Sequence, residues 1–166
     1  MDRSEITGRH MTLEEVMRPA TSVRQDTRAI EALEVMLGNG LPGLPVVNDR
    51  GYLVGFVGES HLLASTLPKF VTFVDHLPRS HEGADGWVRY DRSATDRPVE
   101  TLTIREAPTV DIEHSEIVAA HKMVRDGAPC VVVTDMGRVV GIVTRTEFYE
   151  TIIGRKARPR AAYSEE

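Results

Sequence analysis

A cluster of polar residues, Thr144-Arg145-Thr146-Glu147, directly follows an apolar run that ends at Val143. This order predicts a strand running into a helix, where unpaired backbone N–H groups and the positive end of the helix dipole meet polar side chains. A carboxylate at Glu147 can accept from both hydroxyls of a ribose diol, the two threonines offer further hydrogen bonds, and Arg145 can neutralise a phosphate. The cluster therefore favours a sugar phosphate as ligand.

The same spacing also fits a role without any ligand. Thr144 and Glu147 match a capping box, in which the Thr144 hydroxyl accepts from the Glu147 N–H and the Glu147 carboxylate accepts from the Thr144 N–H. From the motif alone, both interpretations stay open.

Other motifs that suggest chemistry do not have the required context. The run Gly38–Gly43 matches G-x-G-x-x-G, but it ends a predicted helix and leads into a strand, whereas a dinucleotide site follows a strand and opens a helix. Cys130 adjoins an apolar strand and is expected to be a buried small hydrophobe. Asp111, His114 and Ser115 stand at a helix start, where capping explains Ser115. No catalytic residue is assigned.

A polar segment in the middle of the chain carries residue types that bind divalent metals, but loops rich in polar residues are commonly just solvated. No metal site is expected. A small hydrolase or metal enzyme that uses this segment is the least favoured function. The residues concerned are Asp75, His76, His81, Glu82 and Asp85.

Composition restricts the class of protein. The 166 residues carry 20 Lys and Arg against 25 Asp and Glu, a net charge of −5, which argues against a general nucleic-acid binder. No apolar run is long enough to span a bilayer, and the N-terminus lacks the apolar stretch of a secretory signal. One cysteine excludes an intramolecular disulfide. We expect a cytoplasmic protein without membrane contact.

An internal repeat organises the chain. Ser22-Val23 aligns with Thr109-Val110, Gly40 with Gly127 and, after a one-residue gap, Gly51 with Gly137. The repeat predicts two units, each ordered strand, helix, strand, strand, helix. In each unit, apolar residues at helical spacing end at Gly40 or Gly127, a glycine-containing hairpin follows, and a second helix starts near Ser60 or Thr146. The helical spacing is carried by Ile30, Leu33, Met36 and Leu37 and by Ile117, Ala120, His121 and Val124.

These features together resemble a tandem pair of CBS domains, also called a Bateman module. The resemblance rests on VMRPATSV beside VETLTIREAPTV, on a G-x-V-V-G-I-V-T strand and on the T-x-x-E ending, all in tandem. It implies a mixed α/β fold (α+β-like), in which two pseudo-symmetric β-α-β-β-α units pack sheet to sheet as one module. It also implies a homodimer formed through the helices.

The resemblance assigns the following organisation to the chain. Residues 1–11 form an N-terminal tail, 12–64 the first CBS unit, 65–97 a connector, 98–153 the second CBS unit and 154–166 a basic tail. The connector is expected to hold an extra apolar helix over Leu67–Val74 and a polar loop. The basic tail is expected to be a solvated end.

For function, the resemblance implies no catalysis and no required cofactor. Such pairs bind adenosyl compounds, such as AMP, ADP, ATP or S-adenosylmethionine, in clefts between the units and regulate a partner protein. The nucleotide-binding residues implied here are Val16, Arg18, Thr21, Leu41, Pro42, Ile142, Thr144, Arg145, Thr146 and Glu147. The apolar members of this set also fit ordinary core packing. The family usually has Asp where this chain has Glu147.

The first CBS unit, residues 12–64, departs further from the family pattern. Gly58 and His61 replace the threonine and the acid, and a neutral imidazole cannot accept from both diol hydroxyls. We therefore expect asymmetric occupancy of the two clefts. The weaker cleft would comprise Gly58, His61, Thr103, Pro108, Ala128 and Pro129. The alternative function is a ligand-free oligomerisation or docking module with vestigial clefts.

Overall fold

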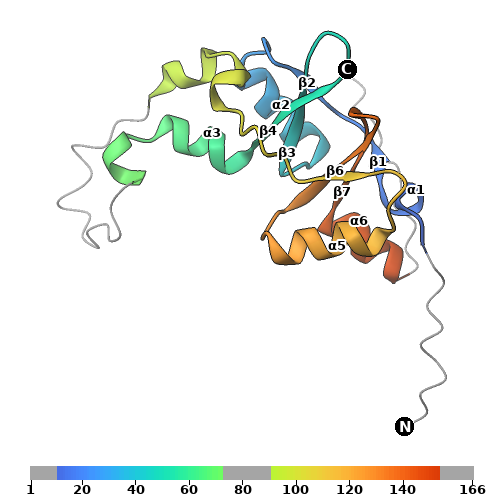
Figure 1. Ribbon diagram of the computed structural model, residues 1–166. Helices are drawn as coiled ribbons and strands as arrows, with labels where there is room; N and C mark the ends of the chain where they lie inside the picture. The colour runs from blue at the N-terminus through green and yellow to red at the C-terminus, as the bar shows by residue number, and fades with distance from the viewer. Residues whose placement is uncertain (1–10, 73–90, 154–166) are drawn as a thin grey trace, which may run out of the picture. The chain divides into compact units, whose positions relative to one another are not determined.

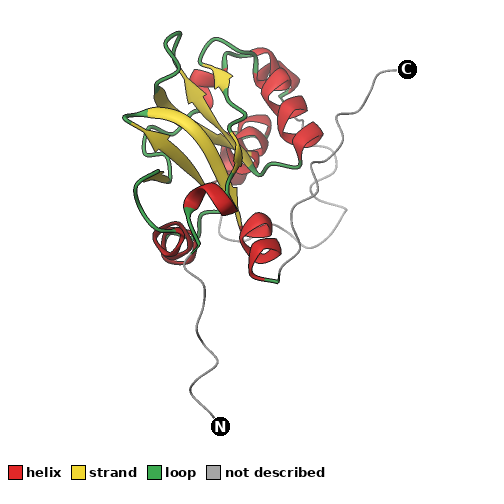
Figure 2. Ribbon diagram, turned by 90° about the vertical axis from the view of Figure 1, so that its right-hand side faces the viewer, coloured by secondary structure: helices red, strands yellow, loops and turns green. Residues whose placement is uncertain are grey.

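The chain divides into two compact units. One comprises Met1–Ala20 with Pro108–Glu166, and the other comprises Thr21–Ala107. The computed structural model describes residues 11–72 and 91–153. Figures 1 and 2 show that each unit combines strands with helices, so the predicted mixed α/β class is confirmed.

The first unit, formed by both ends of the chain, contains a four-stranded sheet in the order β1-β7-β6-β5. β5 runs parallel to β6, whereas β6 with β7 and β7 with β1 are antiparallel. Valines of the sheet pack with Ala119, Met123, Leu13 and Val16 in the core. The elements are α1 (Leu13–Val16), β1 (Arg18–Pro19), β5 (Thr109–Asp111), α5 (Glu116–Arg125), β6 (Cys130–Asp135), β7 (Arg138–Thr144) and α6 (Arg145–Ile152).

The second unit contains a three-stranded sheet in the order β2-β3-β4, with β2 parallel and β4 antiparallel to β3. Its strand β3 is buried along its whole length. Besides the strands, two α-helices and three 3₁₀ helices belong to its described part. The elements are β2 (Val23–Arg24), α2 (Ala29–Asn39), β3 (Gly43–Val47), β4 (Leu53–Gly58), α3 (Glu59–Thr66), η1 (Lys69–Thr72), η2 (Arg92–Asp96) and η3 (Val99–Leu102).

Each unit combines the leading segment of one repeat with the remainder of the other repeat. The leading segment of the first repeat ends at Ala20, and that of the second ends at Ala107. In the first unit, β1 pairs with β7, so that Arg18 lies opposite Ile142. Figure 1 shows this blue segment beside the orange strand β7. In the second unit, Ile104 forms a bridge with Phe56 of β4. The exchange brings residues from opposite ends of the sequence onto one sheet.

The predicted element order is confirmed in both repeats. α2 ends at Asn39 and is followed by Gly40 in the left-handed region at φ 61°, while Gly127 after α5 has φ 65°. This conformation disfavours a side chain, which explains why glycine terminates both helices. The second helices begin at Glu59 and Arg145, one residue before the predicted starts.

The helices bury only some of the apolar residues whose spacing predicted them. α5 buries Ala119 and Met123, whereas Ile117 and Val124 are exposed. α2 likewise buries Met36 and exposes Leu37. The fully buried residues of both helices are alanines and methionines, whereas several of the other large apolar residues lie on the surface.

The connector is described only in part. Of the helix expected over Leu67–Val74, the structure has a 3₁₀ helix at Lys69–Thr72, and the last two residues lie outside the described range. The polar loop and its five Asp, His and Glu residues of metal-binding type lie outside it too, as does the basic tail. Among the residues described, no helix has the length and apolarity needed to cross a membrane.

Candidate functional site

The junction of β7 and α6 holds the polar cluster. Thr144 ends β7 and is the N-cap of α6. Its hydroxyl accepts from the Glu147 N–H at 3.3 Å, and Oε2 of Glu147 accepts from the Thr144 N–H at 3.1 Å. The Thr144 hydroxyl also donates to the same carboxylate oxygen. The capping box is therefore complete, and it fixes the position of the Glu147 carboxylate.

The other oxygen of this carboxylate contacts a cation from the opposite end of the chain. Nη1 of Arg18 lies 3.3 Å from Oε1 of Glu147, and the two side chains are 26% and 13% exposed. Arg18 reaches this point because β1 pairs with β7. Both residues belong to the predicted nucleotide site, but the sequence did not predict that Arg18 pairs with Glu147.

Gly141 permits the close approach of β1. A Cβ at this position would lie 3.1 Å from the Arg18 carbonyl oxygen and would overlap the Met17 side chain. A larger residue would therefore push β1 away from β7 and take Arg18 with it.

Arg145 contacts a different element. Its Nη2 donates to the Met123 carbonyl, near the C-terminal end of α5, at 3.3 Å. The guanidinium thus satisfies a carbonyl at the negative end of that helix. Thr146 is exposed on the first turn of α6. Of the two arginines in the predicted nucleotide site, Arg18 is the one at the Glu147 carboxylate.

The apolar candidates of this unit are core residues. Val16 and Ile142 are fully buried, and Val16 packs in the main cluster with Leu13. Of the weaker cleft, Pro108 is half-buried, Ala128 is buried and Pro129 is exposed; the Pro108 carbonyl accepts from the Val132 N–H. None of these contacts concerns Glu147.

The second unit holds the remaining predicted residues. Leu41 is buried, while Thr21 and Pro42 are half-buried. Gly58 precedes α3, and its N–H donates to Nδ1 of His61 at 3.0 Å. Thr103 donates to the Val99 carbonyl. His61 therefore reaches back to the start of its helix as Glu147 does, but with a ring nitrogen instead of a carboxylate.

Burial and a nearby carboxylate change the pKa of Cys130, which lies opposite Thr144 on the neighbouring strand. Burial, together with the negative charge of Glu147, raises the pKa of this thiol from 9.0 to about 12. The thiolate is the nucleophilic form, so the side chain acts as a buried hydrophobe, as predicted. In the described parts of the chain, no group of three or more His, Cys, Asp or Glu side chains is arranged to hold a metal ion.

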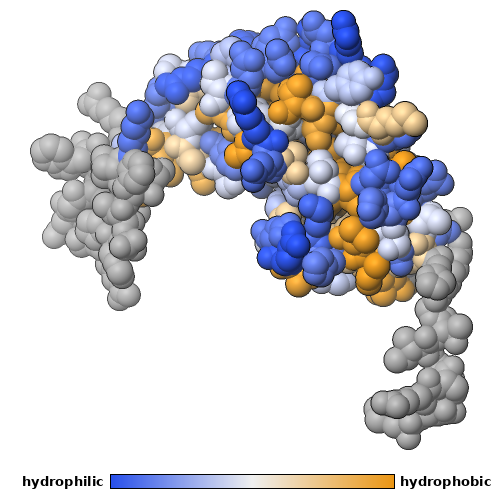
Figure 3. Space-filling model, viewed as in Figure 1, coloured by the Kyte–Doolittle hydropathy of each residue, from blue (hydrophilic) through white to orange (hydrophobic). Residues whose placement is uncertain are grey.

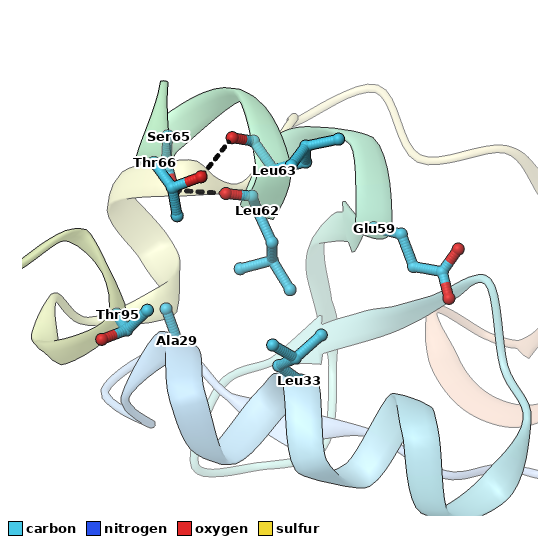
Figure 4. Close-up of a pocket in the computed structure, with 8 residues that line it drawn as sticks. All are labelled: Ala29, Leu33, Glu59, Leu62, Leu63, Ser65, Thr66 and Thr95. Atoms are coloured by element: carbon cyan, nitrogen blue, oxygen red, sulfur yellow. Dashed lines mark hydrogen bonds between the residues drawn. The ribbon is translucent and has the colours of Figure 1, made fainter. Parts of the chain in front are cut away.

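A cavity of about 190 Å³ lies between α2, α3 and η2 of the second unit. Figure 4 shows the side chains of Leu33 and Leu62 meeting in it. The hydroxyls of Ser65 and Thr66 donate to carbonyls of their own helix, so they are not oriented toward a ligand. The cavity is apolar and contains none of the predicted nucleotide-binding residues.

Comparison with known proteins places these features in a family. The model of the CBS domain matches residues 13–67 and 99–154. The chain is also 23% identical over 164 residues to the uncharacterized protein MJ1426 of Methanocaldococcus jannaschii, a match that covers 92% of this chain and 98% of that protein.

Solved structures share the fold. The crystal structure of CBSX2 in complex with AMP is 22% identical, with a TM-score of 0.65 over 87% of this chain and 97% of that chain. A putative acetoin utilization protein, AcuB, from Vibrio cholerae is 18% identical, with a TM-score of 0.67 over 88% and 93%. Because the family model covers both repeats, and the fold agrees, the chain belongs to the CBS-domain family as a tandem CBS-domain pair.

Proposed function

We propose that the protein is a non-enzymatic regulatory module that binds an adenosyl nucleotide and modulates a partner protein. The observation that carries this proposal is the Glu147 carboxylate, which is fixed by the Thr144 cap beside the Arg18 guanidinium. A carboxylate suits a ribose diol, and a guanidinium suits a phosphate. The AMP complex of CBSX2, which shares this fold, supports an adenosyl ligand.

Titration of the full chain with AMP, ADP, ATP and S-adenosylmethionine tests the binding. The chain must first be shown by mass spectrometry to be free of nucleotide, and any nucleotide found at that stage already supports the proposal. A ligand present at 100 times its dissociation constant should stabilise the fold by about 2.7 kcal/mol, measured by thermal unfolding. Absence of binding and of stabilisation for all four compounds would exclude the proposed ligand class.

The substitution Glu147→Gln tests whether the Glu147 carboxylate binds the nucleotide. It removes a negative charge but retains much of the shape, and it should weaken nucleotide binding about ten- to hundredfold, as expected for the loss of charge-assisted hydrogen bonds. Calorimetric titration measures the change. Glu150→Gln is the matched control, because Glu150 lies one turn further along α6. Equal affinity of Glu147→Gln and wild type would assign Glu147 to helix capping alone.

We propose that the two clefts are occupied unequally. Because Nδ1 of His61 accepts from the Gly58 N–H, the neutral ring carries its proton on Nε2, which is then a donor. Such a side chain has no acceptor left for a ribose diol. A stoichiometry of one nucleotide per chain, measured by calorimetry, is the expected result. The assignment of Thr21, Leu41, Pro42 and the weaker-cleft residues to ligands stays a prediction.

A second candidate function is assembly without a ligand. It is favoured by large apolar side chains exposed on the helices, which include Ile117 and Val124 on α5 and Tyr149 and Ile152 on α6. Figure 3 shows hydrophobic side chains at the surface in the region of these two helices. Such surfaces mark interaction sites in soluble proteins. We propose a homodimer through these helices, and nucleotide found bound to the purified chain would reject the ligand-free version.

A further inference from the structure

We propose that His61 makes the start of α3 sensitive to acid, because protonation of its imidazole removes the cap of this helix. The inference does not depend on the proposed ligand. It follows from the hydrogen bond that the His61 ring accepts and from what stands at the equivalent position of the other repeat.

The His61 ring caps the start of α3. The helix begins at Glu59, and the N–H of the preceding Gly58 donates to Nδ1 of His61 at 3.0 Å. Gly58 has no side chain that could cap the helix as a threonine hydroxyl does. Because Gly58 is buried, its N–H is costly to leave without an acceptor. The ring nitrogen therefore stabilises the junction between β4 and α3.

Nδ1 of His61 can accept a hydrogen bond only while the ring is neutral. In an imidazolium both ring nitrogens carry a proton, and both are donors. A protonated His61 can therefore not accept from the Gly58 N–H, and it adds a positive charge at the positive end of the helix dipole. Histidine is the side chain that ordinarily changes its charge between pH 5 and 8. Acid in this range replaces a supporting acceptor by an opposing cation.

The charged groups on the neighbouring elements do not pair with the His61 ring. The elements that pack against α3 are α2, β4, η2 and η3, and β4 has no ionisable side chain. In the described part of the chain, none of the carboxylates on the other three forms an ion pair with the ring. Glu59 lies two residues earlier in α3, a spacing at which helical side chains do not face each other. The charged residues concerned are Glu31 and Glu34 on α2, Arg92 and Asp96 on η2 and Glu100 on η3.

The corresponding helix of the other repeat, α6, is capped without a histidine. The Thr144 N–H donates to the Glu147 carboxylate, and the Thr144 hydroxyl accepts from the Glu147 N–H. Protonation of an imidazole cannot open this cap. Acid is therefore expected to act on the start of α3 and not on the start of α6, which serves as a control inside the same chain.

Urea unfolding of the full chain at pH 7.5 and pH 5.5 tests the inference. Gln is also found at this position of capping boxes, and its amide oxygen accepts at both pH values. The urea midpoint of wild type should fall by about 0.5 M more than that of His61→Gln, as expected for the loss of one cap. His121→Gln removes an exposed histidine of α5 in the other unit and should keep the acid response of wild type.

Amide hydrogen exchange, followed by NMR at the same two pH values, locates the response. In wild type, the Gly58 N–H should lose protection about tenfold at pH 5.5, and the Thr144 N–H should keep its protection. Unchanged protection at Gly58 would overturn the inference. His61→Glu supplies the carboxylate of the other repeat in case Gln does not cap the helix. If the midpoints of both variants fell as far as that of wild type, the inference would also be overturned.

Discussion

At the scale of single residues, the length of the Glu147 side chain decides what its carboxylate can do. The family usually has Asp at this position, and the additional methylene lets the carboxylate reach back to the N-cap of its own helix. The two interpretations of the T-x-x-E motif are therefore not exclusive. The cap exists, and it holds a carboxylate whose other oxygen contacts Arg18. The sequence predicted the cap, but local spacing carries no information about a residue from the far end of the chain.

The raised pKa of the Cys130 thiol makes the free energy of unfolding depend on pH in the alkaline range. Its pKa is about 12 in the folded chain against 9.0 for an ordinary cysteine, so between these values the unfolded chain releases a proton that the native chain keeps. Stability is therefore unaffected below pH 9 and falls as the pH rises from 9 to 12. At pH 10, this linkage should cost about 1.4 kcal/mol.

Urea unfolding of wild type and Cys130→Ala at pH 7.5 and pH 10 measures this effect. Other groups titrate in both proteins, so the informative quantity is the difference between the two free energies of unfolding. The advantage of wild type should shrink by about 1.4 kcal/mol at the higher pH. An unchanged difference would mean that the thiol titrates normally in the folded chain.

At the scale of elements, the sequence predicts what short-range patterns control. The helix ends at Gly40 and Gly127 follow from the left-handed backbone there. The positions of the strands along the chain follow from the apolar runs. The 3₁₀ helices η2 and η3 were not predicted, because short i, i+3 turns leave no apolar period. The buried face of α5 was also not evident, since Ala119 and Met123 are a weaker hydrophobic signal than Ile117 and Val124.

In the unit that contains β1, the exchange of leading segments involves a close contact between β1 and β7. Gly141→Ala places a methyl group against the Met17 side chain and the Arg18 carbonyl, and should destabilise the chain by about 1–3 kcal/mol, as overpacking does. The same change should weaken AMP binding, because Arg18 moves with β1. Urea unfolding and calorimetry measure the two effects.

Gly38→Ala is the matched control for this substitution. Gly38 lies inside α2, and a Cβ there would meet nothing within 4 Å. Alanine is a better helix former than glycine, so this variant should be more stable by about 0.5–1 kcal/mol. If both variants were equally stable, the β1–β7 contact would not be sterically limited.

At the scale of the whole molecule, some of the large apolar residues are buried in the cores of the two units, and others are exposed on the surface. Each unit is small, and small domains bury a limited share of their surface. The described helices nevertheless leave large apolar residues on the surface, and α6 buries none of its residues fully. Exposure of this kind is costly in a monomer. It supports the proposed homodimer.

The substitution Val124→Asn tests whether the α5 face mediates a homodimer. Val124 is 84% exposed, so its replacement should not disturb the fold of its unit, and Val and Asn have similar helix propensities. We expect the dimer to dissociate at least tenfold more readily, measured as the dependence of mass on concentration by light scattering after gel filtration. Dissociation should also lower the unfolding temperature, because self-association stabilises the folded chain by mass action.

Met136→Asn provides the control for an equally exposed side chain away from the helices. Met136 is 89% exposed in the turn between β6 and β7, and its φ of 48° suits asparagine. The mass of this variant should follow that of wild type at every concentration. If Val124→Asn also did so, the α5 face would not hold the assembly together. If wild type were a monomer throughout, the apolar helix faces would have to serve a partner protein instead of a second copy.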